Sequence, residues 1–371
     1  MPHRLTLTED QERLLKSHQD IDLLARTSGL PFISGWETTH EIRYEHLEGV
    51  RRPVDPFDYR FMSDDEELKD KIRRFHRRVD GILSSRSDVF LGAGSSPLLS
   101  SVMTLLARAG VREVLYAKPI YHTYYFLAQT FGLRFAPIGD ALSLPGEEGL
   151  ADNLPERESV LLITDPSWIS GRPLGDDVWR AIGRWQERTG SMVFVDGTFS
   201  YTRWDEMAPE AASRLDPERT IRLVCPTKSL CVHGVRFAYL LLPAQLEQEL
   251  AYCYCKLVAA TSAFDISVAH RMMDQLLAPT SNRALTAYLQ ERYRDLRAAG
   301  IILDSLVEPS CTYYTFGRAG YESSSILSMG SSYFELDYPD DYIRINLLSP
   351  DLPTPDEAFA VHATAGKRAV S

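Results

Sequence analysis

Lys228 and Arg236 stand close together in residues 225–239, CPTKSLCVHGVRFAY, with a glycine between them. A lysine held in a partly dry site has a lowered pKa and can form a Schiff base with a carbonyl compound. The planar guanidinium of an arginine offers paired donors that suit a phosphate. Together the two residues predict a lysine that carries pyridoxal phosphate covalently and an arginine that binds its phosphate. The other interpretation of such a pair is ordinary surface charge.

A second candidate site follows the apolar run VFLGA, where Gly94, Ser95 and Ser96 precede a helical pattern. Backbone N–H groups at a helix N-terminus can bind an anion. Serine is also an ordinary N-cap residue that needs no ligand. The segment therefore predicts a helix start that is either capped alone or capped and also bound to a phosphate.

Three further side chains can complete a ligand site. Asp196 ends a very apolar strand pattern, where an unpaired carboxylate is costly, so we expect a cationic partner such as a protonated pyridine nitrogen or an arginine. Tyr121 lies in an expected loop and can stack on a flat ring or belong to the core. Arg344 alternates with two isoleucines in a strand pattern and can bind a substrate carboxylate or face solvent.

The elements that must position these residues alternate along the middle of the chain. Seven strand-like runs rich in Val, Ile, Leu, Phe and Tyr cover residues 87–94, 112–119, 133–139, 159–166, 191–197, 220–226 and 236–243. Helical patterns between them cover residues 96–110, 124–132 and 176–190. This alternation predicts an α/β fold with a mostly parallel seven-stranded sheet, and ligands of such sheets bind beyond the carboxyl ends of the strands.

The C-terminal part of the chain predicts a smaller α+β unit. An amphipathic helical stretch is expected over residues 282–306, followed by strands at 311–317, 324–330 and 342–348. Residues 1–44 lack the parallel-sheet pattern and are expected to join this unit. The predicted domains are therefore a large domain at 45–282 and a small one made of 1–44 and 283–371.

Composition narrows the class of protein. The 371 residues, 44% of them hydrophobic, allow a large buried core, and the net charge of -11 argues against nucleic acid as the main partner. The mixed charges at residues 64–78 predict an exposed helix. No apolar run is long enough for a membrane span, and the N-terminus lacks the apolar core of a signal peptide. Five cysteines without CxxC spacing predict reduced thiols, no metal site and a cytoplasmic location.

In sequence order and rough spacing, these residues resemble the class I and II aminotransferases, which are pyridoxal-phosphate enzymes of fold type I. The resemblance runs from about Tyr59 to Arg344, and its most specific part is the lysine and arginine of the opening segment. It implies an aspartate-aminotransferase-like fold with a large cofactor domain. It also implies that Lys228 forms the internal aldimine and moves the proton, that Asp196 pairs with the pyridine nitrogen and that Tyr121 stacks on the ring.

The resemblance implies further roles around the cofactor and the substrate. The phosphate would be held by Gly94, Ser95, Ser96, Thr227 and Arg236. Arg344 would take the α-carboxylate of the substrate, and Trp36 with residues 331–334 would line the side-chain pocket. Tyr59 resembles the tyrosine that family members offer to the phosphate of the neighbouring subunit, which implies a homodimer with shared active sites.

Three positions depart from the family pattern. The NPxNPTG loop of the family is DPSWISG at residues 165–171, so Trp168 replaces the asparagine that donates to the phenolic oxygen of the cofactor. Phe199 replaces the tyrosine that donates to the same oxygen, and Cys225 stands where a phosphate-binding serine or threonine is common. Both usual donors to that oxygen are therefore missing, and Tyr201 could supply a substitute.

Three functions follow from these observations. The first is an aminotransferase acting on an L-amino acid. The second is a specialised pyridoxal-phosphate enzyme of amino-acid tailoring in secondary metabolism, which performs elimination, cyclisation or oxidation and is compatible with Phe199. The third is a cofactor-binding protein without catalysis, against which the presence of Lys228 and Asp196 argues.

Overall fold

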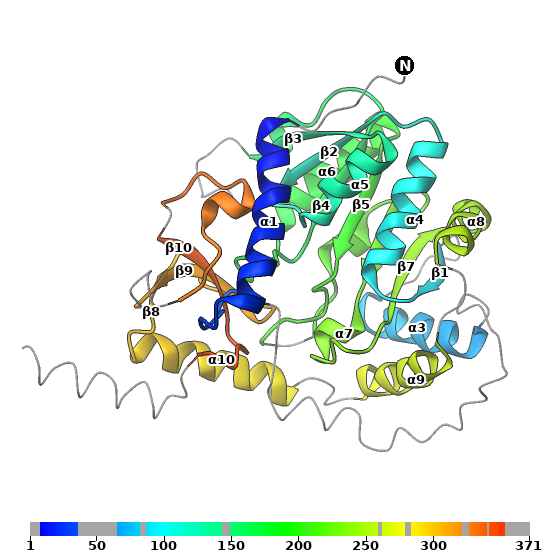
Figure 1. Ribbon diagram of the computed structural model, residues 1–371. Helices are drawn as coiled ribbons and strands as arrows, with labels where there is room; N and C mark the ends of the chain where they lie inside the picture. Colours follow the sequence, from blue (N-terminus) through cyan, green and yellow to red (C-terminus); the bar gives the residue numbers. More distant parts are fainter. Residues whose placement is uncertain are drawn as a thin grey trace, which may run out of the picture.

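The computed structural model describes residues 8–35, 65–81, 87–142, 149–205, 207–258, 262–278, 283–320, 326–339 and 341–352 (Figure 1). Its larger part is built on one seven-stranded sheet with the strand order β1-β7-β6-β5-β4-β2-β3. The strands are β1 (Ser87–Gly92), β2 (Glu113–Lys118), β3 (Arg134–Asp140), β4 (Val160–Thr164), β5 (Met192–Gly197), β6 (Thr220–Val224) and β7 (Ala238–Pro243). β7 runs antiparallel to β1 and β6, and the other neighbouring strands are parallel. The mostly parallel seven-stranded sheet predicted from the sequence is therefore confirmed.

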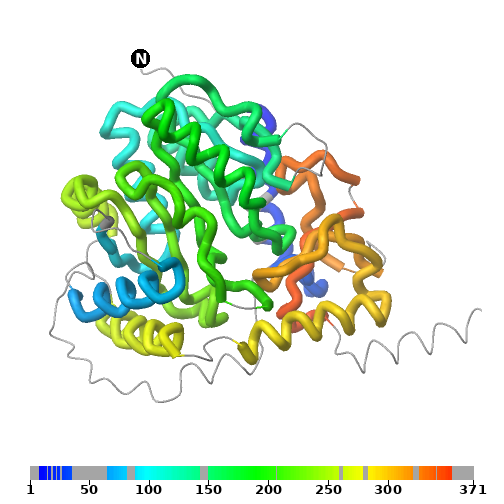
Figure 2. Tube along the Cα trace, turned by 180° about the vertical axis from the view of Figure 1, so that it is seen from behind, coloured from blue at the N-terminus to red at the C-terminus, as the bar shows by residue number. Residues whose placement is uncertain are grey.

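Helices cover both faces of this sheet (Figures 1 and 2). One face packs against α4 (Ser95–Arg108), α5 (Thr123–Phe131) and α8 (Glu247–Leu257), and the other against α3 (Glu66–Val79), α6 (Asp176–Thr189) and α9 (Ala263–Leu277). β4, β6 and β7 are buried along their whole length, as expected for strands with a helical layer on each side. Short helical turns lie at η2 (Leu150–Asn153), η3 (Ala211–Arg214), α7 (Pro226–Ser229) and η4 (Ala244–Leu246).

A smaller unit is built on an antiparallel sheet with the strand order β10-β9-β8. Its elements are α10 (Arg283–Ala298), β8 (Ile302–Ser305), β9 (Tyr314–Ala319), η5 (Ser331–Phe334) and β10 (Tyr342–Asn346). The helix expected over 282–306 is wrong at its C-terminal end, because Gly300 turns the chain at φ 69° and Ile302 then pairs with Ala319 in a strand. The strand expected at 324–330 is also wrong, since its described residues make only isolated bridges, Leu327 with Phe32 and Gly330 with Ile343.

The N-terminal helix α1 (Glu9–Thr27) lies between the large sheet and the smaller unit (Figures 1 and 2). Leu14 of α1 belongs to the same core as α4 and α5, whereas Ile21 and Ile33 belong to the core of the smaller unit. The described contacts of residues 8–35 are thus shared between the two units. The domain boundaries near residues 45 and 282 stay a prediction.

A second junction between the units is a buried cluster of hydroxyl groups around one carboxylate. Tyr116 of β2 and Tyr125 of α5 donate hydrogen bonds of 2.8 and 2.6 Å to Oε2 of Glu335, the residue that follows η5. Both tyrosines are almost fully buried. The carboxylate therefore fixes the segment after η5 against the large sheet.

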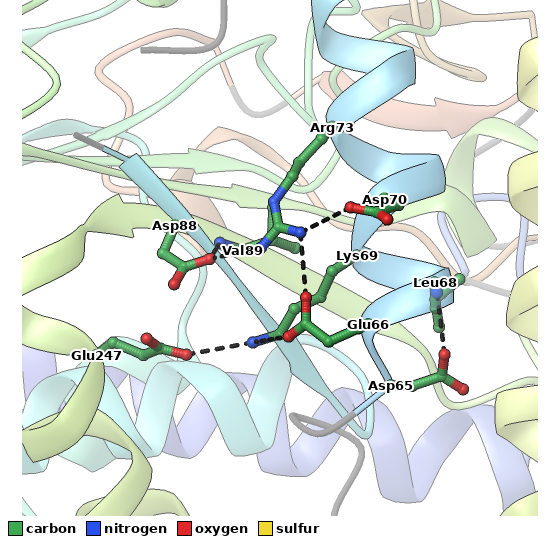
Figure 3. Close-up of polar contacts among 9 residues, drawn as sticks. All are labelled: Asp65, Glu66, Leu68, Lys69, Asp70, Arg73, Asp88, Val89 and Glu247. Carbon is green, nitrogen blue, oxygen red and sulfur yellow. Dashed lines mark hydrogen bonds and ion pairs between the residues drawn. The ribbon is translucent and has the colours of Figure 1, made fainter. Parts of the chain in front are cut away.

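The helix α3 corrects the expectation of an exposed, mixed-charge helix. Lys69 and Lys71 are buried, and their ammonium groups reach the carboxylates of Glu247 and Asp274. Lys69 Nζ lies 3.2 Å from Glu247 at the start of α8, and Arg73 Nη2 lies 3.1 Å from Asp88 of β1 (Figure 3). These ion pairs join α3 to the edge strand and to α8.

None of the helices within the described ranges is long and apolar enough to cross a membrane. The five cysteines are free thiols, four of them buried. Within the same ranges no group of three His, Cys, Asp or Glu residues is arranged to hold a metal ion.

Candidate active site

A cavity of about 380 Å³ lies at the carboxyl ends of the large-sheet strands, where the smaller unit closes over them. Residues from β1–α4, β4, β5, β6–α7 and β9–β10 contribute to its wall. This is the edge at which ligands of parallel sheets bind. Twelve of the sequence-predicted site residues line it together: Gly94, Ser95, Ser96, Tyr121, Trp168, Asp196, Phe199, Cys225, Thr227, Lys228, Arg236 and Arg344.

One end of the cavity is suited to an anion. α4 begins there, with Ser95 and Ser96 in its first turn and Gly94 as its N-cap residue at φ 92°. The side chain of Arg236 lies over Gly94, so that a Cβ added at Gly94 would meet its Nη2 at 3.0 Å. Backbone N–H groups of a helix start, hydroxyl groups and one guanidinium make a site that fits a phosphate, and Thr227 lines the same cavity.

Asp196 lies at the centre of the cavity floor, at the end of β5, and is 2% exposed. The Tyr124 hydroxyl donates a 2.9 Å hydrogen bond to its Oδ2, and the Thr198 hydroxyl and N–H donate to its Oδ1. Burial raises the pKa of Asp196, and these hydrogen bonds oppose the rise. The expected cationic partner is not present among the described residues, so a protonated ring nitrogen from a ligand fits this carboxylate.

Lys228 reaches the cavity from the turn after β6. Its Nζ lies 5.8 Å from the centroid of the Phe199 ring, and the described residues give it no hydrogen bond or ion pair. Burial lowers the pKa of Lys228, and the positive charges of Arg236 and Arg344 lower it further. The neighbouring thiols do not oppose this at neutral pH, since burial raises the pKa of Cys225 and of Cys231 to about 12 and both are uncharged. The amine is thus prepared to react with a carbonyl group.

Arg344 lies opposite, in β10, enclosed by aromatic rings. Its Cζ is 4.5 Å from the ring centroid of Tyr314, 4.9 Å from that of Trp168 and 5.5 Å from that of Phe334. Its Nε donates to the carbonyl oxygen of Ser34 at 3.2 Å. Burial lowers the pKa of Arg344, and no carboxylate among the described residues compensates its charge. A buried guanidinium in this state suits a carboxylate that enters with a ligand.

The loop after β4 forms the wall between Asp196 and Arg344. Trp168 in this loop stands edge-to-face with Tyr121, at 5.7 Å between ring centroids. The loop ends at Gly171, whose carbonyl oxygen accepts hydrogen bonds from the N–H groups of Ser310 and Cys311 at 2.8 and 3.0 Å. A Cβ added at Gly171 would lie 2.4 Å from the Tyr314 carbonyl oxygen. Only glycine therefore allows the loop to approach the smaller unit so closely.

Two polar atoms in the cavity wall are buried without a hydrogen-bond partner among the described residues. They are Nε1 of Trp168 and Oγ1 of Thr164. Trp168 is 6% exposed and Thr164 is 5% exposed, and both residues line the cavity. A ligand that offers an acceptor atom would satisfy them.

The structure does not bring every predicted residue to the cavity. The expectation that Tyr201 supplies a substitute donor is wrong, because Tyr201 is buried away from the cavity. Its hydroxyl donates a 2.8 Å hydrogen bond to Asp80 and accepts one of 3.0 Å from Arg222. This buried charge pair holds the hydroxyl, so Tyr201 cannot replace a donor in the cavity. Tyr59 and Trp36 lie outside the described residues, and their predicted roles stay predictions.

Sequence reasoning missed several residues that line the cavity or bond to its lining. Tyr124, in the first turn of α5, donates to Asp196, but an aromatic-rich run gives no sign of which hydroxyl reaches a carboxylate. Thr164 ends β4 directly opposite Asp196 in the strand pairing, and that position at a strand end could have marked it. Ser34, Tyr314 and Met329 enter from the smaller unit, whose pairing with the sheet edge has no local sequence signature.

The chain matches the family model described as "Aminotransferase class I and II" over residues 59–302. No curated protein matches it.

Solved structures are similar over nearly the whole chain. The N-succinyldiaminopimelate aminotransferase of Mycobacterium tuberculosis has a TM-score of 0.73 and 17% identity, covering 97% of this chain and 100% of that chain. An Escherichia coli protein with a methionine aminotransferase function has a TM-score of 0.71 and 17% identity, covering 98% of this chain and 97% of that chain. The kynurenine aminotransferase of Pyrococcus horikoshii has a TM-score of 0.73 and 14% identity, covering 96% and 95%. At these identities the likeness shows the fold.

Proposed function

The chain belongs to the class I and II aminotransferases, a family of pyridoxal-phosphate-dependent transferases, and from this premise we propose that it transfers the amino group of an L-amino acid with Lys228 as the cofactor-bearing residue. The observation that carries the proposal is one cavity containing an anion site, a buried carboxylate and a lysine of lowered pKa. Three known parts of the cofactor, its phosphate, its ring nitrogen and its aldehyde carbon, match these three groups. No other cofactor class is needed to explain the set.

Each group has a task in holding the cofactor. Ser95, Ser96, Thr227 and Arg236 bind the phosphate through hydroxyl, N–H and guanidinium donors. Asp196, fixed by Tyr124 and Thr198, keeps a proton on the ring nitrogen. When bound, pyridoxal phosphate accepts the electron pair that is left when the substrate loses its α-proton.

The remaining groups act on the substrate. Arg344 binds the α-carboxylate, because its guanidinium is buried and has no carboxylate partner in the described structure. Nζ of Lys228 would take up the proton from the α-carbon of the substrate and hold it within the cavity, because burial lowers its pKa and favours its neutral form. The rings of Tyr121, Trp168 and Phe199 exclude water from these proton transfers.

Labelling tests the central assignment. Borohydride treatment of the holoenzyme followed by peptide mapping should place the reduced cofactor on Lys228, and Lys228→Ala should lose turnover while keeping its fold. A label on another residue, or full turnover by Lys228→Ala, would refute the proposal.

A second candidate is favoured by one observation, the apolar ring of Phe199 in the cavity wall. An enzyme of amino-acid tailoring, performing elimination, cyclisation or oxidation, is compatible with this wall. Incubation with an amino acid and no keto acid separates the two. Stoichiometric formation of the amino form of the cofactor, followed by arrest, supports transamination, whereas continued release of ammonia or uptake of oxygen supports the second candidate.

We also propose a homodimer of cytoplasmic location whose active sites share residues across the interface. Large apolar side chains are exposed on several helices, including Phe126 of α5, Tyr252 of α8 and Phe264 of α9, each more than half exposed. Such side chains are available to a second copy of the chain. Light scattering of the purified holoenzyme tests the dimer, and a monomer at micromolar concentration would contradict it.

A further inference from the structure

The unpartnered donors Trp168 Nε1 and Thr164 Oγ1 need an acceptor that the described protein does not provide. A polar group buried without a partner costs about 1–3 kcal/mol, and native proteins leave few such groups unexplained. Both residues are more than nine-tenths buried and both line the cavity, so the cavity is the side from which an acceptor can reach them. Two such groups in one cavity wall point to a ligand atom that accepts hydrogen bonds.

The place of these donors in the sheet restricts which ligand atom they meet. Thr164 ends β4 and pairs in register with Asp196 at the end of β5, and Trp168 follows in the loop after β4. The anion site at Gly94 follows β1, and Lys228 follows β6. In the order β1-β7-β6-β5-β4, the anion site and the donors therefore lie on opposite sides of Asp196.

The covalent structure of pyridoxal phosphate has the same order. Its ring nitrogen lies across the ring from the carbon that bears the aldehyde. The phosphate arm leaves one edge of the ring between these two points, and the ring hydroxyl leaves the other edge. A cofactor with its nitrogen at Asp196 and its phosphate toward Gly94 would present its hydroxyl edge on the side away from the anion site, which is the side of β4.

We propose that the indole N–H of Trp168 and the hydroxyl of Thr164 are the donors to the ring oxygen of pyridoxal phosphate in this protein. Phe199 has no donor to offer at this edge, and the Tyr201 hydroxyl is held by Asp80 and Arg222. The assignment gives the tryptophan a binding role rather than a packing role alone. It rests on the proposed function, because it requires the cofactor to be attached at Lys228.

The donors have a measurable effect on the nitrogen that joins Lys228 to the cofactor. Hydrogen bonds to the anionic ring oxygen withdraw negative charge from it, and the oxygen then attracts the proton on that nitrogen less strongly. Losing a donor should therefore raise the pKa of this nitrogen, which is read from the pH dependence of the visible absorption band of the holoenzyme. A hydrogen bond to a charged group corresponds to a rise of about 1 to 2 in this pKa.

The experiment compares four variants of the holoenzyme without substrate. Trp168→Phe removes the N–H and keeps an aromatic ring, and Thr164→Val removes the hydroxyl at nearly constant shape. Thr164→Ser keeps a hydroxyl and should behave as the wild type. Trp204→Phe is the matched control, because Trp204 is also 6% exposed but donates its Nε1–H at 2.7 Å to the carbonyl oxygen of Thr312, away from the cavity.

We expect Trp168→Phe and Thr164→Val each to raise the spectroscopic pKa by about 1 or more and to weaken cofactor binding about tenfold, with no such change in Trp204→Phe or Thr164→Ser. Unchanged spectroscopic pKa and affinity in both donor variants, with the cofactor still on Lys228, would overturn this proposal and leave the proposed function intact. If the indole N–H bound the substrate and not the cofactor, the substrate-free enzyme would likewise show no change in spectroscopic pKa or cofactor affinity, and the proposal would be refuted. Absence of the cofactor from Lys228 in the wild type would instead refute the proposed function.

Discussion

Gly94→Ala is expected to weaken cofactor binding in addition to destabilising the fold. Gly94 has φ 92° and ψ 173°, a conformation that is open almost only to glycine and costs other residues about 1–3 kcal/mol. The new methyl group would also lie 3.0, 3.2 and 3.3 Å from Nη2, Cζ and Nε of Arg236. The guanidinium must therefore move by a few tenths of an ångström, away from the helix start to which we assign the phosphate.

The loss of stability and the loss of cofactor affinity can be measured separately. The strain should lower the free energy of unfolding of the apoprotein by about 1–3 kcal/mol. Displacing one charge-assisted hydrogen bond of Arg236 costs about 1.5–3 kcal/mol of binding, which raises the dissociation constant of pyridoxal phosphate about 10- to 150-fold. Urea unfolding of the apoprotein gives the first quantity, and absorbance titration with the cofactor gives the second.

Gly190→Ala is the matched control for this prediction. Gly190 ends α6 at φ 73°, and a Cβ there would lie 3.2 Å from Nη1 of Arg219, another arginine, but no part of it lines the cavity. This variant should lose about 1–2 kcal/mol of stability and bind the cofactor as the wild type does. If Gly94→Ala binds the cofactor with wild-type affinity, or if Gly190→Ala weakens binding equally, the assignment of the phosphate to this helix start is wrong.

Three further outcomes follow from the site and its supports. Arg344→Lys keeps a charge but loses the planar donor pair, so it should raise the KM for the amino acid at least about tenfold with little change in cofactor affinity. An equal weakening of amino-acid and cofactor binding would contradict the carboxylate role of Arg344. Glu335→Ala should lower the free energy of unfolding by about 2 kcal/mol, because the hydroxyls of Tyr116 and Tyr125 lose their acceptor, whereas Glu335→Gln should lose less in the same urea titration. Burial raises the pKa of Glu210 from 4.5 to about 8, so the native state holds a proton that the unfolded chain has released, and stability falls as pH rises through this window. Glu210→Gln should therefore show a smaller fall in Tm between about pH 5 and pH 8 than the wild type, and an unchanged slope would contradict the protonated state of Glu210.

Local patterns in the sequence were sufficient to predict the strands of the large sheet. All seven expected runs contain a strand, because strands covered on both faces need continuous apolar runs and turn residues close them. The same reasoning placed Asp196, Lys228 and the start of α4 at one edge of the sheet, since carboxyl ends of parallel strands meet there. Spacing and residue type were therefore sufficient to predict the central residues of the cavity.

The incorrect predictions concern segments whose conformation or burial depends on contacts with distant parts of the chain. The helix expected to continue to 306 ends at Ala298, because pairing of Ile302 with Ala319 stabilises a strand that the amphipathic pattern does not distinguish from a helix. Lys69 and Lys71 of α3 are buried although charge alone predicted exposure, because carboxylates from α8 and α9 reach them. The Tyr201 hydroxyl is bound to Asp80, a partner far away in sequence that no local pattern indicates.

The contact at Gly171 has a mechanical consequence for the enzyme. The loop that carries Trp168 leaves the large sheet at β4, yet its end is bonded to the backbone at residues 310 and 311 and leaves no room for a side chain. Any displacement of the smaller unit would therefore also displace this loop, while Asp196 and Lys228 would stay with the sheet. The cavity wall thus combines residues fixed to the large sheet with two, Trp168 and Arg344, whose positions depend on the smaller unit.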